Sequence, residues 1–262
     1  MMQSRAPVRP RAAVRSGPAH VLALARTALY SVAATTFFIL TTLAFAFTFA
    51  LPPDRMRFLL SSWAAGDVLL LRLIVGQRTA ILGRENIPQA AALVAVKHQS
   101  AWETLALVPL LPRGAVILKK ELLSIPLYGW YARYFGMIPV DRAAGPAALR
   151  QLVKDAAVAL RRGAQIVIYP EGTRRPIGAP PDYKPGAIFL YEKLDVPMVP
   201  VALNSGLLWP HGRYVKYPGT ITVSFLPAIP PGLKRAEVQR RLREAIEAET
   251  DRLVAAAQAA AR

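Results

Sequence analysis

The residues from Ala91 to Glu103 read Ala-Ala-Leu-Val-Ala-Val-Lys-His-Gln-Ser-Ala-Trp-Glu. The first six are apolar, and a short apolar run that ends in polar residues predicts a strand buried on both faces. Similar runs recur at residues 115–118, 136–140, 165–169, 197–203 and 221–226. Helical periodicity occupies segments between or after them, at residues 102–111, 121–135, 147–162, 184–194 and 234–258. Strands that alternate with helices predict an α/β fold, with a mostly parallel sheet flanked by helices on both faces.

Unusual polar residues follow the first of these strands. Active sites in parallel sheets lie in the loops beyond the carboxyl ends of the strands. His98 occupies such a place, and a neutral imidazole takes a proton from a hydroxyl when an acid holds its other nitrogen. Glu103 is the candidate acid. The spacing of Ser100 and Glu103 equally fits a capping box at the start of a helix, and the local sequence leaves both interpretations open.

Two further strand ends carry residues suited to an anion. Arg142 follows the run at 136–140, and Glu171-Gly172-Thr173-Arg174 follows the run at 165–169. The planar fork of arginine donates paired hydrogen bonds to a phosphate, and glycine lets backbone amides approach an anion closely. Taken singly, such loops are more often ordinary solvated surface. The run at 197–203 carries no chemistry of its own and is interpreted as a wall of the site.

The composition narrows the classes of function. Hydrophobic residues make up 53% of the 262-residue chain, which excludes a disordered protein. Cysteine is absent from the sequence, which excludes disulfides, thiolate nucleophiles and cysteine-bound zinc. The net charge of +17 indicates a polyanionic neighbour, either nucleic acid or an anionic membrane. The arginines are spread and the aromatic residues lie in apolar runs, a pattern that disfavours a nucleic-acid surface.

The first part of the chain predicts a membrane anchor. Residues 1–26 form a basic tail without acidic residues, and no charged residue occurs from Thr27 to Pro53. The uncharged run is longer than the apolar core of a signal peptide, so we expect a retained membrane segment. Positive charge before such a segment places the tail in the cytoplasm. We therefore divide the chain into a cytoplasmic tail at 1–26, a membrane-anchoring helical segment at 27–77 and an α/β domain at 78–262.

The anchor contains a second apolar stretch, Phe58 to Val75, interrupted by Asp67 and Arg72. Pro52 and Pro53 separate the two stretches, and such a pair breaks a helix. A single span would put the rest of the chain outside the cytoplasm. A helical hairpin that dips into one leaflet would return it to the starting side. Basic residues at the turn disfavour exposing the turn on the far side, so we expect the hairpin.

Four segments carry a family resemblance in their order along the chain: the one after the first strand, the two further strand ends and the run at 197–203. Together they resemble the glycerophospholipid acyltransferase superfamily. The resemblance is closest to the bacterial 1-acyl-sn-glycerol-3-phosphate acyltransferases. Their pattern is His-x4-Asp, Gly-x-Ile-x-x-x-Arg, Pro-Glu-Gly-Thr-Arg and Val-Pro-x-x-Pro-Val, and it covers Lys97 to Val201 here. Glu103 departs from this pattern, because it stands at the position of the family's aspartate and is one methylene longer.

The resemblance implies a reaction and a role for each candidate residue. A fatty acyl group would pass from acyl carrier protein or coenzyme A to the 2-hydroxyl of lysophosphatidic acid, giving phosphatidic acid. His98 would be the general base, and Glu103 would orient it. The acceptor phosphate would be bound by Arg142 and by Glu171, Gly172, Thr173 and Arg174. Lys119 and Lys120 resemble a further family segment, and Lys120 would aid phosphate recognition unless it belongs to a solvated basic face.

The resemblance also implies partners and a location. No metal and no bound cofactor are expected, because the thioester brings its own leaving group. The partners would be lysophosphatidic acid, the acyl thioester with its carrier and anionic membrane lipids, without nucleic acid. The enzyme would lie at the cytoplasmic membrane, with its catalytic domain on the cytoplasmic side. Two alternatives remain, a related acyltransferase that uses glycerol-3-phosphate or a lyso-aminolipid as acceptor, and a non-enzymatic basic membrane-binding protein.

Overall fold

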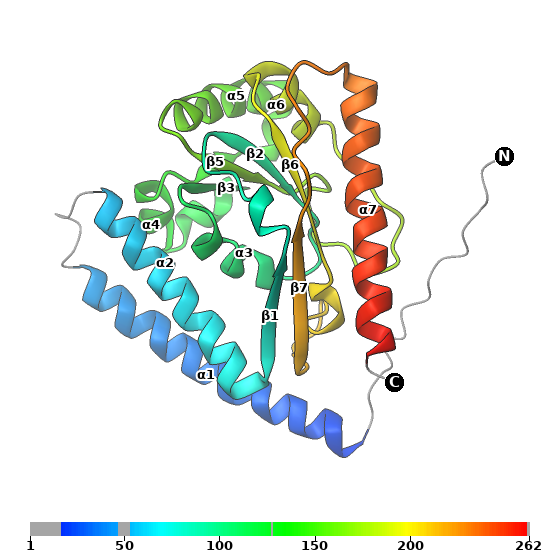
Figure 1. Ribbon diagram of the computed structural model, residues 1–262. Coiled ribbons are helices and arrows are strands. Elements are labelled where there is room, and N and C mark those ends of the chain that lie inside the picture. The colour runs from blue at the N-terminus through cyan, green and yellow to red at the C-terminus, as the bar shows by residue number, and fades with distance from the viewer. Residues whose placement is uncertain (1–16, 47–52, 127, 261–262) are drawn as a thin grey trace.

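The computed structural model describes residues 17–46, 53–126 and 128–260, and its centre is a seven-stranded sheet (Figure 1). The strands lie in the order β1-β7-β6-β2-β5-β3-β4. Every neighbouring pair is parallel except β6 and β7, which confirms the predicted mostly parallel sheet. The strands are β1 Gln77–Leu82, β2 Ala92–Val96, β3 Gly114–Lys119, β4 Ile138–Val140, β5 Gln165–Ile168, β6 Met198–Leu203 and β7 Gly219–Phe225. The sequence analysis did not predict β1, whose first residues are polar.

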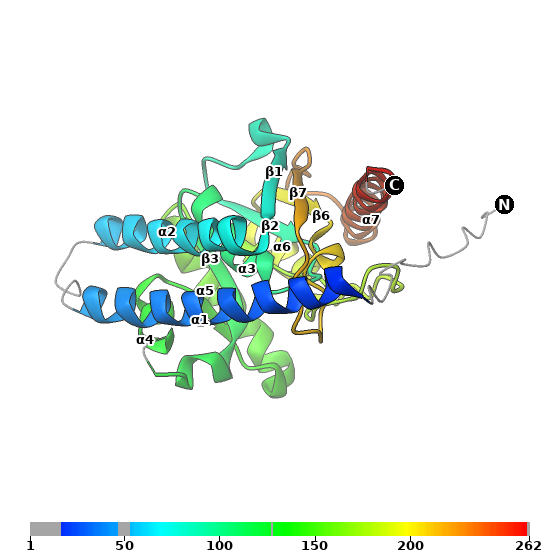
Figure 2. The same ribbon diagram turned by 90° about the horizontal axis from the view of Figure 1, so that it is seen from below.

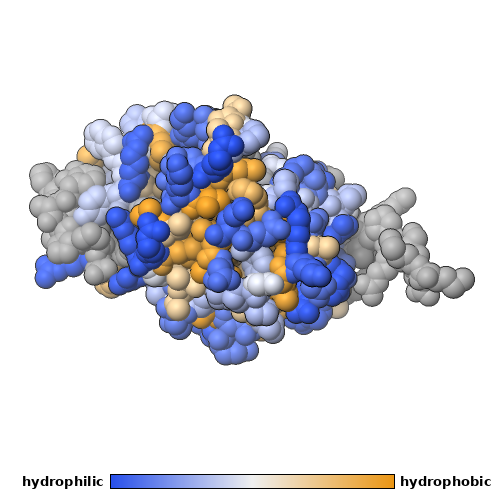
Figure 3. Space-filling model, turned by 90° about the horizontal axis from the view of Figure 1, so that it is seen from above, coloured by the Kyte–Doolittle hydropathy of each residue, from blue (hydrophilic) through white to orange (hydrophobic). Residues whose placement is uncertain are grey.

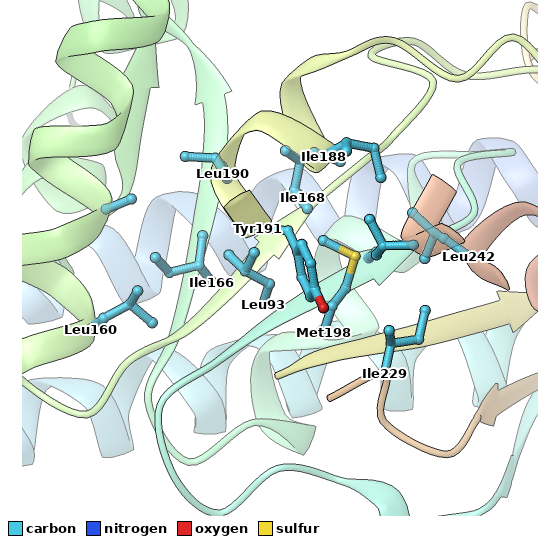
Figure 4. Packing of buried hydrophobic residues seen from close by; sticks show 14 of the residues in the cluster. Leu93, Leu160, Ile166, Ile168, Ile188, Leu190, Tyr191, Met198, Ile229 and Leu242 are labelled. Carbon is cyan, nitrogen blue, oxygen red and sulfur yellow. The ribbon is translucent and has the colours of Figure 1, made fainter. Parts of the chain in front are cut away.

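Helices cover both faces of the sheet. They are α3 Trp102–Ala106, α4 Tyr128–Tyr134, α5 Gly145–Arg161, α6 Gly186–Leu194 and α7 Arg235–Ala259. Leu93 and Ala95 of β2 pack among residues of α5, α6 and α7, a cluster seen in Figure 4. Val94 and Val96 point the other way, into a cluster that includes Trp102 of α3. All five residues of β2 are buried because both faces are covered, which explains the continuous apolar run.

Two predicted helices are shorter than expected, and proline gives the reason. The segment predicted as a helix at 121–135 forms a 3-10 turn, Lys120–Ser124, followed by α4 from Tyr128. Pro126 lies between the two pieces and has no backbone N–H for a helical hydrogen bond. In the same way α3 ends at Ala106, and a 3-10 turn that contains Pro109 follows it.

The N-terminal helices α1 Pro18–Ala46 and α2 Pro53–Leu70 lie side by side and run in opposite directions (Figures 1 and 2). A short π-helical turn, Leu71–Val75, continues α2 to the sheet. The helix α1 begins at Pro18, within the segment interpreted as a tail. Two segments, Pro18–Ala44 and Phe58–Val75, are long and apolar enough to cross a membrane by length and composition, among the described residues.

The first half of α1 is fixed to the α/β domain by polar contacts. The hydroxyl of Thr27 accepts a hydrogen bond from the backbone N–H of Lys216 at 2.9 Å. The hydroxyl of Tyr30 donates to Asp67 of α2 at 2.9 Å, so this acidic residue of the apolar segment faces protein. The ammonium group of Lys216 lies 4.4 Å from the ring centre of Trp209 and 5.2 Å from that of Tyr30, within range of a cation–π contact.

Seen from above, the surface of the molecule has a central hydrophobic area with hydrophilic residues around it (Figure 3). This view lies above α5 and α6, away from the hairpin of α1 and α2. Val158 of α5 is a large hydrophobic residue that is exposed.

Candidate active site

The carboxyl ends of the parallel strands β2, β5, β3, β4 and β6 meet at one edge of the sheet. His98 stands two residues after β2 and Glu103 lies in the first turn of α3. The Nδ1 atom of His98 lies 2.8 Å from Oε1 of Glu103. Nε2 on the other side of the ring has no partner among the described residues, so it is available to a reacting hydroxyl.

Glu103 is completely buried and accepts five hydrogen bonds. Oε1 accepts from His98 and from the backbone N–H groups of Gln99 and Ser100, each at 2.7 or 2.8 Å. Oε2 accepts from the hydroxyls of Ser100 and Ser205, both at 2.8 Å. The carboxylate therefore caps the start of α3 and orients His98 at once. The predicted capping box is present in part, because the N–H of Ser100 donates to Glu103, while the hydroxyl of Ser100 accepts from the N–H of Trp102 and not from that of Glu103. The role of Glu103 as the acid of a catalytic base stays a prediction.

The environment keeps this carboxylate charged. Burial by itself raises the pKa of the Glu103 carboxyl. The hydrogen bond and charge of His98, together with the donors of Ser100, more than offset this effect, and the pKa is lowered below its ordinary value. An ionised Glu103 fixes the proton of the neutral imidazole on Nδ1, which leaves Nε2 as the acceptor.

Ser205 is a site residue that sequence analysis missed. It follows β6 and is completely buried. Its hydroxyl bonds Glu103, 102 residues earlier in the chain. The one signal available was its place beyond the carboxyl end of a predicted strand, where site residues gather.

Tyr169, the first residue after β5, stacks on the ring of His98. The two ring centres are 4.0 Å apart and the planes are inclined by 22°. Burial, followed by the charge of Glu103, raises the pKa of the Tyr169 hydroxyl well above its ordinary value, so this hydroxyl stays neutral. Glu103 thus restrains His98 at the ring edge, and Tyr169 restrains it at the ring face.

A second charged cluster joins the loop after β5 to the last helix. The ammonium group of Lys97 is buried and lies 3.0 Å from Glu171 and 2.8 Å from Glu247 of α7. Tyr183 also donates to Glu247, at 2.9 Å. Burial raises the pKa of Glu171, and the charge of Lys97 opposes this effect. Glu171 was predicted to bind substrate. One oxygen of its carboxylate, Oε1, is engaged in this ion pair, which holds the loop in place, and the substrate-binding role stays a prediction.

The rest of the loop presents its polar groups at the site. Gly172 has a φ of +67°, which an L side chain rarely adopts, and its N–H bonds the carbonyl of Tyr169 at 2.9 Å. The backbone N–H of Arg175 donates to the carbonyl of His98 at 2.8 Å. Thr173 and Arg174 are exposed, and Arg174 has no ion-pair partner among the described residues.

The two remaining predicted residues follow neighbouring strands. Lys120 comes directly after β3, and its ammonium group lies 3.2 Å from Asp141, which follows β4. Arg142 is the next residue and begins a 3-10 turn; its side chain lies outside the described part of the structure. The sheet therefore brings Lys120 and the Asp141-Arg142 turn to the same edge as His98 and the loop from Pro170 to Arg175.

This arrangement can perform base catalysis on a hydroxyl beside an anionic group. An imidazole is oriented by a buried carboxylate, and cationic residues stand at adjacent strand ends. Such a base contributes about 10²–10⁴ to a rate.

Three kinds of comparison place the chain among known proteins. A family model described as Acyltransferase matches residues 78–204. A 1-acyl-sn-glycerol-3-phosphate acyltransferase of Pseudomonas aeruginosa is 36% identical over 210 residues, which is 80% of this chain and 82% of the relative. The human 1-acyl-sn-glycerol-3-phosphate acyltransferase beta is 31% identical over 167 residues, which is 62% of this chain and 60% of the relative.

A solved structure supports the fold. The crystal structure of the 1-acyl-sn-glycerophosphate acyltransferase from Thermotoga maritima matches with a TM-score of 0.73. The match covers 89% of this chain and 98% of that structure, at 22% sequence identity. Its coverage includes most of the chain, beyond the segment that the family model matches.

Proposed function

Since the chain belongs to the 1-acyl-sn-glycerol-3-phosphate acyltransferase family, we propose that it transfers a fatty acyl group to the 2-hydroxyl of lysophosphatidic acid. The product would be phosphatidic acid, an intermediate of phospholipid biosynthesis. The observation that carries the proposal is the contact of 2.8 Å between Nδ1 of His98 and the buried Glu103. It leaves Nε2 of His98 as a base with a fixed direction.

The proposed reaction has two proton transfers. Nε2 of His98 takes the proton of the acceptor hydroxyl while its oxygen forms a bond with the thioester carbonyl carbon. When the tetrahedral intermediate collapses, the carbon–sulfur bond breaks and the thiolate takes the proton from the imidazolium. The products are an ester and a free thiol, and His98 is neutral again. Glu103 stabilises the imidazolium between these steps without taking its proton.

The acceptor phosphate is proposed to lie among Lys120, Arg142 and Arg174. Lys120 and Arg174 are exposed at the carboxyl edge of the sheet. The pair of Lys120 with Asp141 is also exposed, and such pairs contribute only about 0–1 kcal/mol, so a phosphate can replace Asp141. Gly172 and Thr173 belong to the same loop as Arg174 and would offer backbone and hydroxyl donors.

The donor is proposed to be acylated acyl carrier protein or acyl coenzyme A. Both are acidic, and a net charge of +17 favours their approach. We propose that the reaction uses no bound metal or cofactor, because a thioester already carries a good leaving group and His98 supplies the base.

We propose that the hairpin of α1 and α2 anchors the enzyme in one leaflet of the cytoplasmic membrane. Contacts of Thr27 and Tyr30 hold the first half of α1 against protein. The second half of α1 also contacts the domain, where the hydroxyl of Tyr131 in α4 donates to the carbonyl of Thr42 at 3.1 Å. Residues 32–46 are roughly 22 Å long at 1.5 Å per residue, shorter than the hydrocarbon core of about 30 Å. A hairpin of this reach keeps the domain on the side of the tail, where acyl carriers and anionic lipids are found.

An assay of the purified protein tests the reaction. Lysophosphatidic acid is supplied with a thioester labelled in its acyl chain, either acyl–acyl carrier protein or acyl coenzyme A, and labelled phosphatidic acid is measured. We expect product with at least one donor and its loss in His98→Ala. A folded protein that gives no phosphatidic acid with any donor would exclude the proposal.

Single cysteines test the location, because the native sequence has none. One replaces Ser4 and another replaces Ala261, and intact cells are treated with a thiol reagent that does not cross the membrane. We expect both positions to react only after lysis. Labelling of the C-terminal position alone in intact cells would show a single span, with the domain outside the cytoplasm.

A further inference from the structure

Tyr169 has a feature that the proposed reaction does not use. Its hydroxyl is buried and has no hydrogen-bond partner among the described residues. A buried hydroxyl without a partner costs free energy, so this group does not explain why a tyrosine is suited to the position. The ring of Tyr169, by contrast, makes the closest ring contact of His98, with centres 4.0 Å apart and planes inclined by 22°.

The stacked ring and Glu103 act on His98 in different directions. Glu103 of α3 bonds Nδ1 in the plane of the imidazole, at 2.8 Å. Tyr169 covers a face of the imidazole, and the face of an aromatic ring attracts a cation. Tyr128 of α4 is a further titratable group near this pair, and like Glu103 it raises the pKa of the Tyr169 hydroxyl and keeps that hydroxyl neutral. His98 acquires a positive charge when it takes a proton, and both neighbours then stabilise it.

We propose that Tyr169 is a positioning residue whose ring fixes the plane of His98 and stabilises its imidazolium form. The inference rests on the proposed function in one respect, that His98 is the general base. It assigns the effect to the ring and none to the hydroxyl. Phenylalanine should therefore replace Tyr169 fully, and an aliphatic residue should not.

Three variants separate the ring from the hydroxyl. Tyr169→Phe should keep the turnover number and KM for lysophosphatidic acid, and it should not lower thermal stability. Tyr169→Leu should lower the turnover number about 2- to 30-fold, the range expected for a lost cation–π contact, with KM nearly unchanged. Tyr169→Met provides a second variant without the ring, because unbranched methionine fills irregular gaps and preserves folding.

A matched control removes an aromatic ring elsewhere. Phe225 of β7 is buried in the same hydrophobic cluster that Tyr169 packs against, but no ring contact or hydrogen bond of its side chain joins it to His98 or Glu103 among the described residues. Phe225→Leu should lower stability but leave the turnover number of the folded enzyme unchanged. A loss of turnover in Tyr169→Phe equal to that in Tyr169→Leu would overturn the proposal, because the hydroxyl would then be the active part.

A chemical measurement tests the stack without the acyl transfer reaction. Diethyl pyrocarbonate modifies neutral imidazole, and mass spectrometry follows the His98 peptide between about pH 5 and pH 8. His20 and His211 serve as internal references. In Tyr169→Leu the midpoint of modification of His98 should move to lower pH, because the imidazolium loses a stabilising contact, while Tyr169→Phe and Phe225→Leu leave it in place.

The two measurements distinguish two failures. A shifted midpoint in Tyr169→Leu from a protein that forms no phosphatidic acid would support the stack and refute the proposed function. An unchanged midpoint in both variants without the ring, from protein that does form phosphatidic acid, would overturn the role of Tyr169 and leave the proposed function intact.

Discussion

Two buried charges flank the end of β2, and the protein neutralises them in opposite ways. Glu103, on the side of α3, is surrounded by hydroxyl, amide and imidazole donors. Lys97, on the side of α7, is paired with the carboxylates of Glu171 and Glu247. Neutral donors leave the charge of Glu103 available to stabilise an imidazolium. The carboxylates around Lys97 cancel its charge and tie three distant segments together. The first cluster suits the proposed base catalysis, and the second holds the positions of the segments that it joins.

The largest expected effect is in the first cluster. His98→Ala removes the proposed base and should lower the turnover number by about 10²–10⁴, with the fold retained because the imidazole is partly exposed. Steady-state kinetics and circular dichroism measure the two properties. His211→Ala, a change at an exposed position outside the site, is the control and should behave as the parent. Near-normal turnover in His98→Ala would make this residue structural.

The second prediction concerns stability in the other cluster. Lys97→Met leaves Glu171 and Glu247 without their cation, and breaking a buried pair in this way costs about 3–5 kcal/mol. The free energy of unfolding in urea measures this loss. Lys184→Met removes an exposed partner of Asp182 and should change that free energy by no more than about 1 kcal/mol. Equal effects of the two changes would show that the buried cluster does not stabilise the fold.

The third prediction removes only the charge of Glu103. In Glu103→Gln the amide oxygen can still accept from His98, and the amide N–H groups can donate to Ser100 and Ser205. Folding should therefore survive, while the turnover number falls about 10- to 100-fold because a charge-assisted hydrogen bond is lost. Glu103→Asp should retain partial activity. A Gln variant with full activity would reduce Glu103 to a helix cap.

The fourth prediction sharpens the phosphate assignment. Arg174→Ala should raise KM for lysophosphatidic acid about tenfold and leave KM for the acyl thioester nearly unchanged, because one hydrogen-bonded charge contact of about 1.5 kcal/mol is lost. Arg174→Lys should rescue binding only in part, since a point charge lacks the paired donors. An effect confined to the donor would move the phosphate site elsewhere.

The smallest expected effect is the pH dependence of stability, and its sign differs between the clusters. The pKa of Glu103 is lowered by folding, so its contribution is present above its ordinary value of 4.5 and is lost as the pH falls below it. The pKa of Glu171 is raised, so its contribution is present below 4.5 and is lost as the pH rises through the raised pKa. Urea unfolding between about pH 3 and pH 7 should show Glu103→Gln and Glu171→Gln changing the slope in opposite directions. Slopes that change in the same direction would contradict this assignment.

The sequence predicted the parallel sheet because β2 and β6 are apolar and buried along their whole length, as burial on both faces requires, and β3, β4 and β5 contain shorter apolar runs. It did not predict β1, which begins with Gln77 and Arg78. His98 and Glu103 were found because they are five residues apart. Ser205 and Glu247 were missed because their contacts with Glu103 and Lys97 span 102 and 150 residues, and no local pattern records such pairs.

The separation of Lys97 and Glu247 along the chain limits which segments can be exchanged between related proteins to make a chimera. Glu247 reaches Lys97 from α7, while the residues around His98 all precede α7. A chimera cut after β6 would take the reacting groups from one parent and the counter-charge beneath them from another. A chimera therefore needs residues of opposite charge at positions 97 and 247. A chimera with a mismatch should give insoluble protein, which would be seen before any assay of turnover.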